Sequence, residues 1–111
     1  MYKLNFDATV FTDISASGIG VIIRNGSGQV MAALSSKGLA VTNSEEAEVL
    51  ACRRALEFAI ETGFSDLIVE GDNSKVMQSL ASSLPDWSLL GNLYDDVRCL
   101  AGRLRRGISM Y

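Results

Sequence analysis

Three carboxylates occupy positions where an acidic side chain is unusual for the surrounding pattern. Asp7 lies in the middle of an expected strand, Glu48 lies among the apolar residues of an expected helix, and Asp72 follows a short apolar strand. Carboxylate oxygens are the ligands that hard divalent cations such as Mg²⁺ take. Two such ions about 4 Å apart can activate a water and stabilise the leaving oxygen in phosphodiester cleavage. The three acids are therefore candidate metal ligands and candidate catalytic residues.

Each acid also has a purely structural explanation. Asp72 precedes an expected helix, where aspartate is a good N-cap. Asp7 alternates with Leu4, Phe6 and Ala8, so it is compatible with an exposed face of a sheet. Glu48 is compatible with a frayed first helical turn, where the helix dipole favours a negative charge. Because burying a carboxylate without a partner is costly, however, its place among apolar residues predicts a cation nearby.

Hydrophobic periodicity predicts the elements that must position these acids. Residues 3–11 alternate as a strand, and residues 18–36 form two apolar runs joined by Asn-Gly-Ser-Gly, which predicts a hairpin. Residues 42–63 form the clearest helix, with capping residues and acids at its start and Gly63 at its end. Residues 65–72 predict a short buried strand.

The remaining third of the chain predicts two more helices and a last strand. Residues 73–84 favour a helix, Pro85 interrupts it, and residues 86–106 favour another helix. Residues 107–111 have the composition of a final strand. Three meandering strands followed by strand and helix units indicate an α/β domain with a mixed sheet.

Length and composition narrow the class of protein. The chain has 111 residues, 48% of them hydrophobic, which suits one folded domain over residues 1–111. Two cysteines without a metal spacing, and no apolar run long enough for a bilayer, indicate an intracellular protein, nuclear or cytoplasmic. The absence of histidine excludes histidine-based metal sites and general bases.

The overall charge does not favour a nucleic-acid binder. The formal net charge is −3, whereas a protein that neutralises phosphates usually has a basic surface. Four arginines gather near the end of the chain, and they suit either phosphate contacts or a solvated helix end that complements the helix dipole. They are Arg98, Arg103, Arg105 and Arg106.

The motifs that surround the three acids resemble a known family. The sequence is similar to the RNase H-like domain of plant retroelement-type proteins, the reverse-transcriptase-like group. The resemblance extends from about residue 3 to residue 111, and it rests on the order and spacing of four stretches. They read KLNFDA, GIGVIIRNGSGQVMAALS, TNSEEAEVLACRRALEFAIETG and LIVEGDNSKVMQSL.

This resemblance implies a fold, an activity and a cofactor. The fold would be an RNase H-like five-stranded mixed sheet, three antiparallel strands and then parallel strands, with helices packed on it. Asp7, Glu48 and Asp72 would match the family's acids, which bind two Mg²⁺ ions, or Mn²⁺, and cleave the RNA strand of an RNA/DNA hybrid. The implied partner is therefore nucleic acid.

The sequence also departs from the family pattern. Ala8 follows Asp7 where the family usually has glycine. The family continues past the fifth strand into a last helix with a fourth carboxylate, often with a histidine nearby, and both are missing here. A catalytically inactive, truncated module that binds nucleic acid or a protein partner is therefore the alternative to a nuclease. The missing helix would also leave one sheet face uncovered, which predicts a homodimer.

Overall fold

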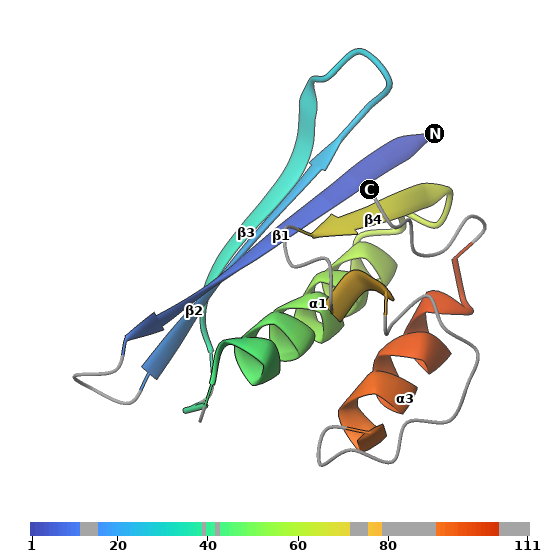
Figure 1. The fold of residues 1–111 in the computed structure, drawn as a ribbon. Coiled ribbons are helices and arrows are strands. Elements are labelled where there is room, and N and C mark those ends of the chain that lie inside the picture. Colours follow the sequence, from blue (N-terminus) through green and yellow to red (C-terminus); the bar gives the residue numbers. More distant parts are fainter. Residues whose placement is uncertain (12–15, 39, 42, 72–75, 79–90, 105–111) are drawn as a thin grey trace.

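The sheet is four-stranded and mixed (Figure 1). The computed structural model describes residues 1–11, 16–38, 40–41, 43–71, 76–78 and 91–104. The strands are β1 (Tyr2–Phe11), β2 (Ala16–Arg24), β3 (Val30–Gly38) and β4 (Leu67–Gly71), in the order β3-β2-β1-β4. The β1–β2 and β2–β3 pairs are antiparallel, whereas β4 lies parallel to β1.

The predicted mixed sheet is confirmed, but the number of strands is not the predicted five. Four strands form among the described residues, and the expected fifth strand at 107–111 lies outside them. Since β4 is a parallel neighbour of β1, the chain must cross over between them, and α1 (Ser44–Glu61) lies within that crossover.

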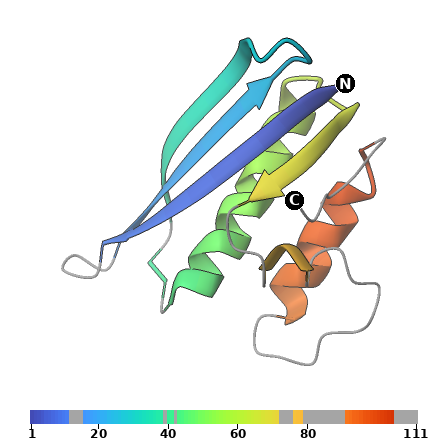
Figure 2. The same ribbon diagram turned by 45° about the horizontal axis from the view of Figure 1, so that its top comes forward.

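Helices lie on one side of the sheet among the described residues (Figures 1 and 2). Helix α1 packs mainly on β1, and α3 (Gly91–Ala101) packs against α1 on its far side from the sheet. Residues 76–78 are helical, and the rest of the predicted 73–84 helix lies outside the described residues. Helix α3 is shorter than the predicted 86–106, since residues 102–104 form a turn.

Local sequence accounts for both ends of α1. Asn43 is its N-cap, and the side-chain Oδ1 accepts a hydrogen bond from the backbone N–H of Glu46 at 2.8 Å. Glu45 and Glu46 place negative charge in the first turn, where the helix dipole favours it. After the helix, Gly63 adopts a φ of 87°, a conformation that side chains disfavour.

Small residues allow α1 to approach the sheet closely. Ala47, Ala51, Ala55 and Ala59 recur every fourth residue, and all four are buried. They lie in one core with the inward side chains of the strands and with Tyr94 and Val97 of α3. The Tyr94 hydroxyl donates a hydrogen bond to Glu45 at 2.8 Å and so links α3 to α1.

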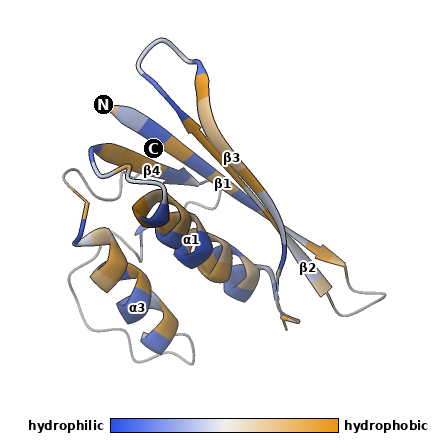
Figure 3. Ribbon diagram, turned by 180° about the vertical axis from the view of Figure 1, so that it is seen from behind, coloured by the Kyte–Doolittle hydropathy of each residue, from blue (hydrophilic) through white to orange (hydrophobic). Residues whose placement is uncertain are grey.

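The predicted hairpin between β2 and β3 is confirmed. The side-chain Oδ1 of Asn25 accepts hydrogen bonds from the backbone N–H groups of Ser27 at 3.0 Å and Gln29 at 2.9 Å. Gly28 takes a φ of 83°, which glycine adopts at low cost. Figure 3 shows that the strands joined by this turn are hydrophobic in the parts next to it, except at Arg24, and that β3 becomes hydrophilic toward its end. In the described part of the chain, no helix is both long and apolar enough to cross a membrane.

The two cysteines differ in accessibility, which gives a direct test of the core. Cys52 on α1 is fully buried, whereas Cys99 on α3 is exposed. We expect iodoacetamide to alkylate Cys99 rapidly in the native protein and Cys52 only after denaturation, because the reagent needs access to a thiolate. Mass spectrometry of tryptic peptides would measure both rates. Equal native labelling of the two thiols would contradict the packing of α1 on the sheet.

Candidate functional site

Asp7 lies in the middle of β1 and is exposed on the sheet face opposite α1. Its neighbours Phe6 and Ala8 pack into the core below α1, so alternation along the strand turns the Asp7 side chain the other way. Its Oδ1 accepts a hydrogen bond from the backbone N–H of Ala8 at 2.9 Å. This confirms the predicted alternation and leaves the carboxylate accessible to a ligand.

A shallow hollow of about 630 Å³ opens beside Asp7 on this face. Its floor is made of small residues: Asp7 pairs with Gly20 on β2, and Gly20 pairs with Ser35 on β3. A Cβ added to Gly20 would meet nothing within 4 Å, so the space above the strand is open. Asn5 and Ala33 also line the hollow. The carboxylate of Asp7 therefore borders a floor that a flat or extended ligand can approach.

Glu70 is a second acid on this face, and the sequence patterns did not single it out. Its Oε2 accepts a hydrogen bond from the Asn5 side chain at 3.2 Å, and its Oε1 lies 3.8 Å from the Lys3 ammonium. Asn5 and Glu70 are direct partners across β1 and β4, which explains the contact. The only signal in the sequence was its place two residues before Asp72. Because both of its oxygens already face protein donors, Glu70 is held as part of the sheet.

Glu48 lies on α1 and is half-buried, as its place among apolar residues predicted. Its Oε2 atom is shielded from solvent. Cys52 follows one turn later in the helix; burial, and secondarily the charge of Glu48, raise the pKa of its thiol well above the ordinary range. The Cys52 side chain is therefore a neutral, apolar neighbour of the carboxylate.

Asp72 lies outside the described residues, but the residue before it is informative. Gly71 ends β4 and pairs with Phe6, the residue before Asp7. A Cβ at Gly71 would come within 2.6 Å of the Phe6 ring and within 3.0 Å of the Met77 sulfur. Glycine is thus required here by close packing, and Asp7 follows Phe6, which forms the last described pair of the parallel ladder.

The described residues include Asp7 and Glu48 but not Asp72, so whether the three predicted acids converge is not tested. Within 1–11, 16–38, 40–41, 43–71, 76–78 and 91–104, no group of three or more cysteine, aspartate or glutamate side chains could hold a metal ion. Asp7 faces away from α1, and Glu48 is on α1. The proposed convergence of Asp7, Glu48 and Asp72 stays a prediction, although the donors themselves are hard oxygens of the kind that Mg²⁺ takes.

A comparison with known protein families identifies the family of this chain. The sequence profile of the family described as reverse transcriptase-like matches residues 5–107. The chain belongs to the reverse transcriptase-like family. A comparison with curated protein sequences found no significant match.

Solved structures that are similar to this chain include RNases H. The chain is similar to RNase H1 from the archaeon Halobacterium salinarum, with a TM-score of 0.82 at 24% identity, over 94% of this chain and 79% of that chain. It is also similar to LC11-RNase H1 in complex with an RNA/DNA hybrid, with a TM-score of 0.79 at 18% identity, over 97% and 81%. It is similar as well to the N-terminal RNase H domain of a Mycobacterium tuberculosis protein, with a TM-score of 0.77 at 22% sequence identity. That alignment covers 97% of this chain and 78% of that chain.

These likenesses establish that this reverse transcriptase-like chain has the RNase H-like fold. They give no support to the predicted homodimer. The homodimer was predicted from the apolar surface expected on an uncovered sheet face. In the described strands, however, that face consists mostly of polar or small residues. Lys3, Asp7 and Ser35 are among the exposed residues on that face.

Two glycine substitutions test the geometry around Asp7. We expect Gly71→Ala to lower the free energy of unfolding by about 1–3 kcal/mol, since the added methyl group overlaps the Phe6 ring. Gly20→Ala is the matched control, because its methyl group enters open space, and we expect no loss of stability. Urea denaturation followed by circular dichroism would measure both. Equal effects would show that Phe6 does not pack over Gly71.

Proposed function

We propose that this reverse transcriptase-like domain is a metal-dependent nuclease that hydrolyses the RNA strand of RNA/DNA hybrids. Asp7, Glu48 and Asp72 would hold two Mg²⁺ ions, or Mn²⁺, and the protein would act inside the cell. The proposal is supported by the family membership, by the RNase H-like fold, and by the hybrid bound to a similar structure.

The observation that carries the proposal is the position of Asp7. It is an accessible carboxylate directly after the last described pair of the β1–β4 ladder, and it borders a hollow that Gly20 also lines. Asp72 follows Gly71 in sequence, so the same ladder end would bring the second acid beside the first. Glu48 would then approach from α1 near Phe6 and Gly71, the last described pair of the β1–β4 ladder.

Asp7 and Glu48 would bind metal differently, because one carboxylate is exposed and the other is partly shielded from solvent. Bound divalent ions would supply an activated water and stabilise the leaving oxygen of the scissile phosphate. Asp7, which is exposed, would hold its ligand where substrate can reach it. Glu48 is partly shielded from solvent, so its charge would act through a lower effective dielectric and bind a cation more strongly.

A cleavage assay with paired variants tests this function. We expect a labelled RNA/DNA hybrid to be cut in Mg²⁺ or Mn²⁺ and left intact in EDTA. Asp7→Asn and Asp72→Asn should each lower the rate by about 100-fold or more, since an amide is a weaker ligand for these ions. Glu70→Gln is the matched control on the same sheet face, and it should cut like the unmodified chain.

A second candidate is a module that binds nucleic acid or a protein partner without cutting. The net charge of −3 favours the form that binds a protein partner, because a hybrid is a polyanion that an acidic chain repels. Folded protein that binds the hybrid but leaves it intact in both metals would establish this alternative. Loss of cutting in Glu70→Gln equal to that in Asp7→Asn would instead contradict the assignment of Asp7 as a ligand.

A further inference from the structure

A hydrogen bond ties helix α3 to the part of α1 that carries Glu48. The Tyr94 hydroxyl donates to Oε1 of Glu45 at 2.8 Å. Glu45 lies in the first turn of α1, and Glu48 follows it by three residues, so the two side chains leave neighbouring positions on the helix surface. Because an α-helix joins each residue to the one four positions earlier, the position of Glu48 follows that of the first turn.

The first turn of a helix is its least constrained part. Its N–H groups have no acceptor inside the helix, so its order depends on caps and on tertiary contacts. Asn43 supplies the cap through its bond to the N–H of Glu46, which is a contact between near neighbours in the chain. Tyr94 supplies a tertiary contact from another element. The fraying that the sequence allowed for Glu48 is therefore opposed at two points.

Tyr94 is held firmly enough to act as an anchor. Its side chain is 1% exposed and lies in the shared core with Val97. The Arg98 guanidinium lies 5.7 Å from the centroid of the Tyr94 ring, a cation–π contact, and donates a hydrogen bond to Asp95 at 3.0 Å. Since a buried tyrosine hydroxyl needs a polar partner, the packing of the ring directs the O–H toward Glu45.

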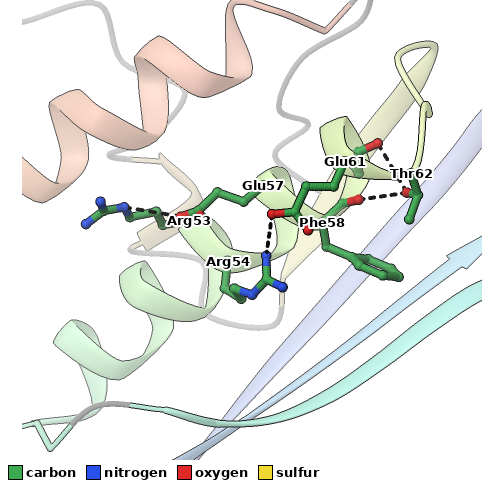
Figure 4. A network of polar contacts seen from close by, with 7 residues as sticks. Arg53, Arg54, Glu57, Phe58, Glu61 and Thr62 are labelled. Atoms are coloured by element: carbon green, nitrogen blue, oxygen red, sulfur yellow. Dashed lines mark hydrogen bonds and ion pairs between the residues drawn. The ribbon is translucent and has the colours of Figure 1, made fainter.

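Two ion pairs farther along α1 differ from this contact. The Arg53 Nε lies 3.4 Å from Glu57, and an Arg54 terminal nitrogen lies 3.3 Å from Glu61 (Figure 4). Both pairs join residues of the same helix and are partly exposed to solvent, so they add little stability and do not tie α1 to α3. The hydroxyl contact joins two helices instead, and its donor residue is buried.

We propose that Tyr94 is a positioning residue for Glu48. Its bond to Glu45 fixes the first turn of α1, and that turn sets where the Glu48 carboxylate lies. A ligand that is already in place binds an ion more tightly, because no side chain has to be ordered when the ion arrives. The inference rests on the proposed function, since Glu48 needs a fixed position only as a metal ligand.

Amide hydrogen exchange of the metal-free protein, followed by ¹H–¹⁵N NMR, tests the positioning itself. We expect Tyr94→Phe, which removes only the hydroxyl, to speed exchange of the Glu48 amide about tenfold, because local opening of the first turn becomes easier. Glu57→Ala is the matched control, since it removes a carboxylate whose ion pair lies within α1, and exchange of the Glu48 amide should not change. Unchanged exchange in Tyr94→Phe would contradict the proposal.

Titration with Mn²⁺ alone, followed by the electron paramagnetic resonance signal of the free ion, tests the consequence for metal binding. We expect Tyr94→Phe and Glu45→Ala each to raise Kd about tenfold, a usual cost of losing a contact that orients a metal ligand. The double variant should bind no more weakly than either single variant, because both changes break the same bond. Glu45→Gln should keep most of the affinity, since its amide oxygen still accepts the hydrogen bond.

The outcomes separate this inference from the proposed function. Val97→Ala removes buried contacts of α3 without touching the hydroxyl, so it should lower stability and leave the Kd for Mn²⁺ unchanged. Equal weakening by Val97→Ala or by Glu57→Ala would overturn the inference. If the unmodified chain binds Mn²⁺ and Tyr94→Phe binds it equally well, the inference fails and the proposed function stands. If the unmodified chain binds no Mn²⁺, both fail.

Discussion

The structure depends on the position of β1 inside the sheet. β1 pairs with β2 along its whole length and with β4 over its first half, so its backbone hydrogen bonds are shared between two neighbours. An interior strand cannot shift by one residue without turning every core side chain to the wrong face. Leu4 and Phe6 are buried below α1, and this alternation leaves Asp7 no other face than the open one.

The same strand determines which residue fits at position 71 of β4. The Phe6 ring occupies the space that a side chain at position 71 would need, so glycine is the residue that lets the two strands pair at this point. The acid of interest follows this glycine in the sequence. A packing requirement and a proposed catalytic role thus belong to adjacent residues.

The packing of α1 shapes the rest of the surface. Ala47, Ala51, Ala55 and Ala59 are buried in the core that the helix shares with the sheet. Arg53, Arg54 and Glu57 of the same helix are at least partly exposed and border a groove beside β3. The two arginines form ion pairs along the helix, Arg53 with Glu57 and Arg54 with Glu61.

Local sequence determined the elements and the face of each strand. The alternation of β1, the Asn-Gly-Ser-Gly turn and the capped helix after Asn43 all depend on neighbouring residues, and each was predictable for that reason. The resemblance of motifs also gave the fold, apart from the number of strands. Tertiary structure alone decided which distant residues meet: Phe6 over Gly71, Asn5 with Glu70, and Tyr94 with Glu45. These contacts join segments far apart in the chain, and neither periodicity nor spacing encodes such distances, because they follow from sheet register and helix packing.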